Sequence, residues 1–254
     1  MLRCLCVVLC VPLCAEVMEL PKLTTPVIVD GDLKEWKEHA FHDGVWDIYR
    51  VRHMPWFEPK INRLTRHGNE ASPAEDLAAR YYTAWDDRYL YLGAEVIDNV
   101  NDVDDPAHEP KRWYFKDAIC WFVEVPRDRV NERFGEGDHA FCFVADARRP
   151  DYAAWHRWGD KTRNYIEEPL KAVEWTLKRG ANGNFVLEAK VDLVKATGGA
   201  PKVGDEWGLE IVHTDPDGGG YGGHIILCGK GDDDNTWGHA RLVGSQPEVE
   251  RKPE

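Results

Sequence analysis

Residues 84–98 have the sequence Ala-Trp-Asp-Asp-Arg-Tyr-Leu-Tyr-Leu-Gly-Ala-Glu-Val-Ile-Asp, which carries the clearest structural signal in the chain. A short polar turn at 86–88 separates two runs that are rich in aromatic and aliphatic residues, at 80–85 and 89–97. Aromatic and β-branched runs on either side of a short polar turn are typical of a β-hairpin. The sequence therefore predicts two adjacent antiparallel strands here.

Further short strands are predicted along the rest of the chain. Residues 173–177 and 185–191 alternate apolar and polar side chains around a glycine- and asparagine-rich turn, which indicates a second hairpin with one solvent-facing side. Residues 117–125 are almost continuously apolar, as expected of a strand that is buried on both faces. We also expect strands at 138–145, 206–213, 224–228 and 236–243. Many short strands with almost no helix predict an all-β fold, an antiparallel, jelly-roll-like β-sandwich of two sheets.

One long segment departs from this strand pattern. Residues 50–79 show no sustained periodicity and contain three prolines and a glycine, so we interpret them as a long irregular insertion. A short helix at 71–79 is predicted inside it, because Ser72 can cap the first turn and Pro73 suits the first helical position.

The first 15 residues have the features of a secretory signal peptide. Arg3 supplies the positive start, residues 5–13 form the apolar centre, and Ala15 is a small residue at a plausible cleavage point. The apolar run is too short to span a bilayer. We therefore predict a signal peptide at 1–15 and a secreted or periplasmic protein.

The remainder, 16–254, has a length that suits a single domain. Lipid attachment at Cys14 is the less favoured alternative for export, because Leu13 precedes it where a small residue is needed. No other segment is apolar enough for us to predict a membrane span.

The net charge excludes some classes of partner. The chain carries a formal charge of -13, which becomes -14 once Arg3 leaves with the signal peptide. An acidic surface repels nucleic acid and anionic lipid, so neither is a predicted partner. A neutral ligand such as a sugar is compatible with this charge.

Three blocks of sequence, in order, resemble the family 9 carbohydrate-binding modules. They are an opening at 27–36 with Asp-Gly-Asp followed by Glu-Trp, the hairpin at 84–98, and the run Asp-Ala-Ile-Cys-Trp-Phe-Val-Glu at 117–124. The resemblance extends over 27–243. It implies a non-catalytic β-sandwich whose partner is a polysaccharide or oligosaccharide.

The resemblance also implies two tryptophans that stack on the sugar. Trp113 or its neighbour Tyr114 matches the first, in a charged loop before the strand that Asp117 opens. The second belongs in the loop before the last strand, but 232–235 contains no aromatic residue, so Trp237 is the candidate. Packing of these rings into the sandwich is the alternative. The expected ligand-binding residues, exposed rings with polar groups at their rims, are Trp113, Tyr114, Asp117, Trp237, Asp234 and Asn235.

Two positions differ from the family pattern. The glutamate that follows the opening aspartate by three residues corresponds to Cys120, and an arginine on the next strand corresponds to Cys142. If these positions are neighbours, as the resemblance implies, the two cysteines are candidates for a disulfide in an exported protein. The expected site then lacks two charged partners for sugar hydroxyls.

Clustered carboxylates raise the question of a metal. Asp98, Asp102 and Asp104 crowd one loop, and the resemblance makes a structural calcium possible there. Their spacing is not that of an EF-hand loop, so a solvated acidic turn is the alternative. The histidines form no His-Glu-x-x-His motif, and neither zinc nor another cofactor is predicted.

Two other functions remain as alternatives. A glycan-acting hydrolase needs two carboxylates across a cleft, one with a raised pKa. The strand carboxylates available for this are Glu95, Glu124, Glu188 and Glu210. A haem-binding electron-transfer domain could use Met54 or His53, but adjacent residues cannot supply both axial ligands of one haem.

Overall fold

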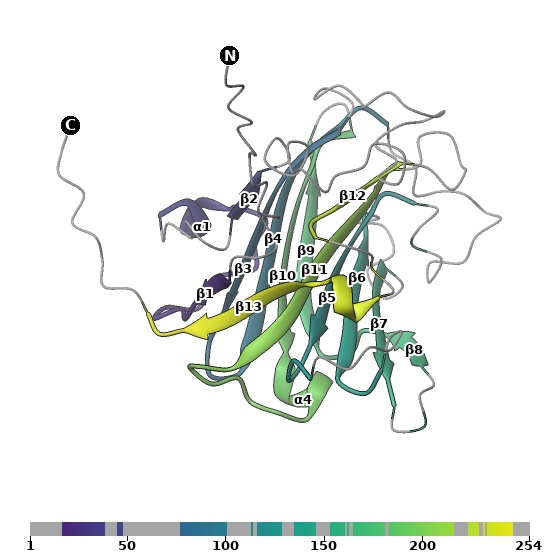
Figure 1. The fold of residues 1–254 in the computed structure, drawn as a ribbon. Coiled ribbons are helices and arrows are strands. Elements are labelled where there is room, and N and C mark those ends of the chain that lie inside the picture. The colour runs from purple at the N-terminus through teal and green to yellow at the C-terminus, as the bar shows by residue number, and fades with distance from the viewer. Residues whose placement is uncertain are drawn as a thin grey trace, which may run out of the picture.

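The computed structural model is a sandwich of two β-sheets (Figure 1). The residues that it describes are 17–38, 45–47, 77–100, 113, 116–128, 135–145, 153–160, 162, 165–180, 183–215, 223–228, 231 and 233–245. Apart from the parallel pair β1 and β13, all paired strands in these ranges are antiparallel. The predicted antiparallel sandwich is therefore confirmed.

One sheet has eight strands in the order β1-β13-β11-β5-β6-β7-β8, with β12 paired to β11. Its strands are β1 Met18–Pro21, β5 Ala118–Glu124, β6 Asp138–Val144, β7 Ala154–Gly159, β8 Tyr165–Pro169, β11 Glu206–Asp215, β12 Gly223–Ile226 and β13 Gly238–Val243. The other sheet has five strands in the order β2-β3-β4-β10-β9. Its strands are β2 Val45–Asp47, β3 Leu77–Trp85, β4 Tyr89–Asp98, β9 Val173–Arg179 and β10 Phe185–Asp192.

Helices are short. The described ones include α1 Lys34–Glu38, α4 Leu193–Thr197 and the 3-10 turn η4 Asp234–Thr236. The helix predicted at 71–79 is wrong in its last residues, because Leu77 begins β3 and pairs with Asp98 of β4. The rest of that segment and of the predicted insertion lies outside the described residues. No described helix has the length and apolar character needed to span a bilayer.

Sequence reasoning missed four of the described strands, β1, β2, β7 and β8, and the last two lie at one edge of the eight-stranded sheet. The run Trp-His-Arg-Trp at 155–158 has bulky side chains on both faces of β7, so the usual alternation of apolar and polar residues is absent. The residues of β8, Tyr-Ile-Glu-Glu-Pro, show no alternation either.

Asp86 holds the turn of the β3–β4 hairpin. One of its carboxylate oxygens accepts hydrogen bonds from the backbone amides of Arg88 and Tyr89, at 2.8 and 2.7 Å. The other accepts the hydroxyl of Tyr91 at 2.7 Å. Arg88 then pairs with Asp192, the residue that caps the N-terminus of α4. The polar turn is therefore built by local hydrogen bonds that Asp side chains commonly make.

The interior of the sandwich consists of rings that meet across the two sheets. Tyr81 of β3 lies edge-on to Trp121 of β5, with ring centroids 6.4 Å apart. The hydroxyl of Tyr81 is 2.7 Å from Nδ1 of His213 on β11. Phe143 of β6 contacts Trp175 of β9, with centroids 5.9 Å apart. These contacts place the odd-numbered side chains of β5 inside the sandwich.

A second, smaller core covers the other side of the five-stranded sheet. Trp36 of α1 packs on Tyr82 there and lies against Gly93, where an added Cβ would be 3.3 Å from the indole. The carboxylate of Glu188 on β10 accepts hydrogen bonds from the indole of Trp36 at 2.8 Å, from the amide of Asp30 at 3.0 Å, and from the amide of Gly31. One buried carboxylate thus attaches the N-terminal segment to the sheet.

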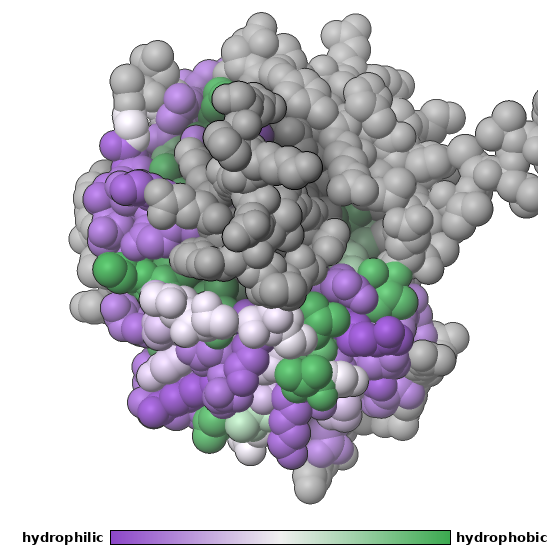
Figure 2. Space-filling view, turned by 90° about the vertical axis from the view of Figure 1, so that its left-hand side faces the viewer, coloured by the Kyte–Doolittle hydropathy of each residue, from purple (hydrophilic) through white to green (hydrophobic). Residues whose placement is uncertain are grey.

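The described surface is mixed in polarity. Figure 2 shows one side of the molecule, where apolar residues form small groups among polar ones. The exposed large apolar side chains in the described part of the chain are Ile28, Ile97, Ile166, Val194 and Val203. Scattered apolar residues of this kind are common on protein surfaces.

We predict that Glu188→Ala lowers the free energy of unfolding by about 3 kcal/mol, because it removes the carboxylate that accepts hydrogen bonds from one buried and two partly buried donors. Urea unfolding measures the loss, and faster hydrogen exchange at residues 30–36 locates it. The control is Glu174→Ala in the adjacent strand, whose side chain is 61% exposed. Equal stability of the two variants would contradict this role for Glu188.

Three buried histidines predict sensitivity to acid. Burial lowers the pKa of His139 to about 4 and those of His156 and His213 to about 3, and His139 further lowers the pKa of His156. The contribution of these three lowered pKa values to the free energy of unfolding is fully present above about pH 6.5, the pKa of histidine in an unfolded chain. Below it the unfolded chain binds protons that the folded chain does not, which costs roughly 1.4 kcal/mol per histidine for each pH unit.

The measurement is urea unfolding between pH 7.5 and 5, for the wild type and for His156→Phe. His156 stacks on Phe141 at 4.9 Å and lies 4.6 Å from the ring of Trp158, and a phenyl ring can keep both contacts. It removes the contact of 3.1 Å between Nε2 of His156 and Nδ1 of His139, at all pH values alike. Burial raises the pKa of Asp138 to about 8, so protonation of this carboxyl increases the free energy of unfolding as the pH falls. This effect is the same in both proteins. The variant should lose less stability on acidification, and an unchanged slope would disprove the prediction.

Candidate functional site

The candidate site lies on the outer face of the eight-stranded sheet, which is the face turned away from the five-stranded sheet. Because Trp121 and His213 point into the sandwich, their neighbours along each strand point outward. Residues that are directly paired across strands share a face. One outward row, read across the strands from β11 to β8, contains Glu210, Phe122, Ala140, Arg157 and Glu167.

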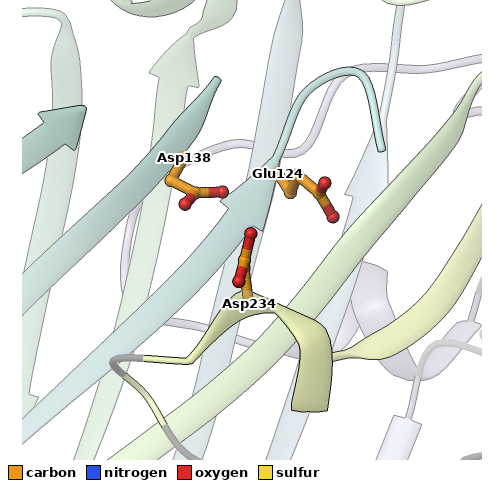
Figure 3. Close-up of side chains that lie close together, drawn as sticks. All are labelled: Glu124, Asp138 and Asp234. Atoms are coloured by element: carbon orange, nitrogen blue, oxygen red, sulfur yellow. The ribbon is translucent and has the colours of Figure 1, made fainter. Parts of the chain in front are cut away.

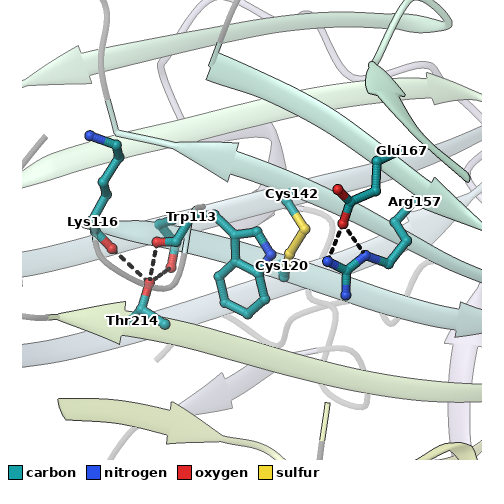
Figure 4. Close-up of a disulfide and its surroundings, with 8 residues drawn as sticks. Trp113, Lys116, Cys120, Cys142, Arg157, Glu167 and Thr214 are labelled. Atoms are coloured by element: carbon teal, nitrogen blue, oxygen red, sulfur yellow. Dashed lines mark hydrogen bonds and ion pairs between the residues drawn. A yellow bond between two sulfur atoms is a disulfide. The ribbon is translucent and has the colours of Figure 1, made fainter. Parts of the chain in front are cut away.

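Three aromatic rings, here called the aromatic cluster, meet on this face. The ring of Phe122 lies between two indoles, with its centroid 6.2 Å from Trp113 and 5.5 Å from Trp237. Trp113 belongs to the loop before β5, and Trp237 follows η4. The hydroxyl of Thr214 donates to the carbonyl of Lys116 at 2.7 Å and lies 3.2 Å from that of Trp113, which anchors the loop (Figure 4).

The expectation that these two indoles are exposed platforms does not hold in this structure. Trp113 is 8% exposed and Trp237 is 2% exposed. The physical reason within the described chain is Phe122, whose ring contacts both indoles and covers part of each. Tyr114, the alternative to Trp113, lies outside the described residues.

A disulfide joins Cys120 and Cys142, the two cysteines that stand where the resemblance implied a glutamate and an arginine. They are direct partners on β5 and β6, with Cα atoms 4.0 Å apart. Figure 4 shows the disulfide beside the indole of Trp113. A neutral crosslink therefore occupies the centre of the outer face.

Polar and aromatic groups continue beyond the disulfide. Trp155 of β7 is the direct partner of Cys142 and is partly exposed. Nε of Arg157 donates to Oε1 of Glu167 at 2.6 Å, and Nη2 of the same guanidinium contacts that oxygen too (Figure 4). Side chains of this pair are 23% and 20% exposed. Sequence reasoning missed these residues because it missed β7 and β8.

Asp117 does not join the aromatic cluster. It is 1% exposed and lies 3.7 Å from the guanidinium of Arg179 on the five-stranded sheet. Arg179 also donates to the carbonyls of Ala145 and Gly183, at 2.6 and 2.9 Å. The contacts of Asp117 therefore include an ion pair between the ends of the two sheets.

The residues of the predicted calcium loop are described only in part. Asp98 is buried, and its carboxylate accepts a hydrogen bond from the amide of Val100 at 2.9 Å. Its backbone amide donates to the side-chain oxygen of Asn184 at 3.0 Å. Asp102 and Asp104 lie outside the described residues, so calcium binding there stays a prediction.

A second group of carboxylates, here called the acid cluster, lies on the outer face next to the aromatic cluster. It consists of Glu124 at the end of β5, Asp138 at the start of β6 and Asp234 in η4 (Figure 3). All three are buried, and one ligand atom from each lies within 4.8 Å of the others. Asn235 donates its amide and its side-chain nitrogen to Asp234, at 2.8 and 3.0 Å. Two of the predicted ligand-binding residues, Asp234 and Asn235, therefore belong to this part of the face.

The pKa of Asp138 is strongly raised. Burial raises its pKa to about 8, against the lowering effect of the Gly135 amide, and the nearby carboxylates of Asp234 and Glu124 raise it further. Of the other strand carboxylates considered for hydrolysis, Glu188 binds the N-terminal segment and Glu210 accepts the amide of Cys228 at 2.9 Å.

Comparison with known proteins agrees with this architecture. A family model described as "Carbohydrate family 9 binding domain-like" matches residues 54–246. No curated protein matches the chain.

Several solved structures are similar to it. A family 9 carbohydrate-binding module from Caldicellulosiruptor kristjanssonii in complex with cellotriose has 15% identity and a TM-score of 0.59, over 94% of this chain and 99% of that one. A module of the same family and organism in complex with glucose has 15% identity and a TM-score of 0.58, over 91% and 99%. A putative carbohydrate-binding protein from Bacteroides uniformis ATCC 8492 has 8% identity and a TM-score of 0.58, over 89% and 99%.

We predict that replacing Cys120 and Cys142 by alanine lowers the free energy of unfolding by about 3 kcal/mol, as expected for a crosslink that closes a loop of this length. The sequence separation of the two cysteines is 22 residues. Thermal unfolding measures the loss. Peptide mapping of the non-reduced wild type should recover the linked pair, and its recovery as two free thiols would contradict the disulfide.

Proposed function

The chain belongs to the carbohydrate family 9 binding domain-like family, and from this we propose that it is a non-catalytic domain that binds a glycan on the outer face of the eight-stranded sheet. The observation that carries the proposal is the row of groups around the disulfide. Trp113 lies on one side of it, and Trp155 with the Arg157–Glu167 pair lies on the other.

The chemistry of a sugar fits these groups. A pyranose ring has apolar faces, which stack on aromatic side chains, and a rim of hydroxyls that need hydrogen-bond partners. Trp155 is a partly exposed indole, whereas Trp113 is almost buried and borders the disulfide from the other side. Arg157 can donate to hydroxyls and Glu167 can accept from them, since both remain partly exposed. Phe122 packs against Trp113, and Trp237 packs against Phe122.

The ligand class follows from charge and from the disulfide. The similar structures from Caldicellulosiruptor kristjanssonii contain cellotriose and glucose, which are neutral sugars. This chain carries a net charge of -13, which disfavours anionic glycans. Cys120 and Cys142 offer no charged group to hydroxyls at the centre of the face. We therefore assign hydrogen bonding to the Arg157–Glu167 pair.

Export is part of the same proposal. The predicted signal peptide at 1–15 directs the chain to a secreted or periplasmic location. A disulfide between Cys120 and Cys142 is compatible with such a compartment, because disulfides persist where the surroundings are oxidising.

We predict that Trp155→Phe weakens glycan binding by about two- to threefold, because a smaller ring loses part of a stacking contact worth roughly 0.5–1.5 kcal/mol. Phenylalanine is chosen because alanine at a buried tryptophan would cost about 3–5 kcal/mol of stability. Calorimetry with cellotriose and retention on insoluble cellulose and other polysaccharides measure binding.

The matched control is Trp175→Phe, which changes an indole on the five-stranded sheet that packs against Phe143. It should bind as the wild type does. The double variant Arg157→Ala with Glu167→Ala keeps the net charge and should also bind less. Unchanged binding in all site variants would place the glycan elsewhere on the molecule. Release of reducing sugar would instead indicate a hydrolase, and a Soret absorbance band would indicate a haem protein.

A further inference from the structure

We propose that the outer face of the eight-stranded sheet prefers a glycan that carries free amino groups, such as a glucosamine oligomer, over the neutral glycan of the same linkage. This inference rests on the proposed glycan binding and names its ligand class. Its basis is the balance of charge around Trp155, where two carboxylates, Glu136 and Glu167, lie near a single guanidinium.

The guanidinium of Arg157 is already compensated by Glu167. Nε of Arg157 donates to Oε1 of Glu167 at 2.6 Å, and Nη2 contacts the same oxygen. No contact of Oε2 of Glu167 is found in the described part of the chain. Glu167 belongs to β8, the edge strand of the sheet, and its side chain is 20% exposed. A carboxylate oxygen can only accept hydrogen bonds, so Glu167 retains the capacity to accept from a hydroxyl or an ammonium of a ligand.

Glu136 brings a second carboxylate to the same part of the face. Its backbone forms an isolated bridge with Gly159 of β7, and a Cβ at Gly159 would overlap the carbonyl oxygen of Gly135. The segment 135–136 therefore crosses the outer face of β7. Because side chains alternate along a strand, Gly159 lies on the same face as Arg157, about 7 Å further along. Glu136 is exposed, and its carboxylate has no ion pair or hydrogen bond with the described residues.

Other charged groups on this face are less suited to contact a ligand. The acid cluster is buried, and Oε2 of Glu124 lies so close to β11 that a Cβ at Gly208 would be 2.6 Å from it. Lys116 is buried too, and Figure 4 shows its ammonium directed away from the disulfide. Glu136 and Glu167 therefore outweigh Arg157 among the described charges that a ligand beside Trp155 would meet.

An amino sugar matches this combination of groups. Its ring has an apolar face that can stack on the partly exposed indole of Trp155, as the ring of glucose can. Its ammonium is also attracted by an indole and by carboxylates, which a hydroxyl at the same position is not to the same extent. A sugar with a carboxylate would instead be repelled by Glu136 and Glu167, and by the net charge of -13.

The test compares three trimers that differ only in the substituent at C2, using the chain from residue 16 onward. Cellotriose has a hydroxyl, the glucosamine trimer has an ammonium, and the N-acetylglucosamine trimer has a neutral acetamide. At about pH 6, where amines are protonated, calorimetry should show that the glucosamine trimer binds about fivefold more tightly than cellotriose, as expected for two exposed ion pairs. This excess should disappear in about 1 M salt, because the Debye length falls to about 3 Å. The N-acetylated trimer should show no excess.

Two variants that remove the same charge locate the effect. Glu136→Gln should reduce the excess affinity for the glucosamine trimer to about twofold, because one of two exposed ion pairs is lost. Glu174→Gln is the matched control, since Glu174 is 61% exposed on β9 of the five-stranded sheet, and it should keep the full excess. Circular dichroism checks that both variants are folded.

Equal affinities for cellotriose and the glucosamine trimer would overturn the amino-sugar preference and leave the proposed glycan binding in place. So would an excess that persists at high salt, one that is unchanged in Glu136→Gln, or one that is lost equally in Glu174→Gln. Binding of none of the three trimers would overturn the proposed function itself, and this inference with it.

Discussion

The contact between Tyr81 and Trp121 across the two sheets is the constraint on which the rest of the structure depends. It directs the odd-numbered side chains of β5 into the interior, and period-two geometry then turns the even-numbered ones to the outer face. Every residue of β5 is buried. Its outward positions are Cys120, Phe122 and Glu124, so one strand supplies a member of the disulfide, of the aromatic cluster and of the acid cluster.

The residues that reveal the family are mainly structural. Asp86 accepts the hydrogen bonds that form the hairpin turn. Glu188 accepts hydrogen bonds from the amide of Gly31, in the Asp-Gly opening, and from the indole of Trp36. Gly93 leaves space for that indole. These groups lie on or beside the five-stranded sheet, whereas the candidate site lies on the other sheet. A resemblance that rests on them therefore predicts the fold well and the ligand poorly.

The outer face combines a neutral centre with charged groups around it. The disulfide replaces two charged positions by a crosslink that offers sugar hydroxyls no ionic partner. Charge is found instead in the Arg157–Glu167 pair on the β7 side and in the acid cluster next to Trp237. Buried carboxylates repel one another unless a proton or cation lies between them, whereas an ion pair stays ionised near the surface. The two charged groups are thus suited to different tasks, structural in one case and contact with a ligand in the other.

The sequence by itself determined most of the strands, the hairpin turn and the family, because alternation of apolar residues and short-range Asp hydrogen bonds are local properties, but it did not predict the short strands β1 and β2. It failed at β7 and β8, where Trp155 and Trp158 place bulky rings on both faces and erase the alternation. The disulfide was implied only by matching Cys120 and Cys142 to a family site. Only the tertiary structure decided that Trp113 and Trp237 are buried against Phe122, and that Asp138 meets Glu124 and Asp234. These groups come from distant segments, and their meeting depends on the strand order β13-β11-β5-β6 and on the space at Gly208, which no local pattern encodes.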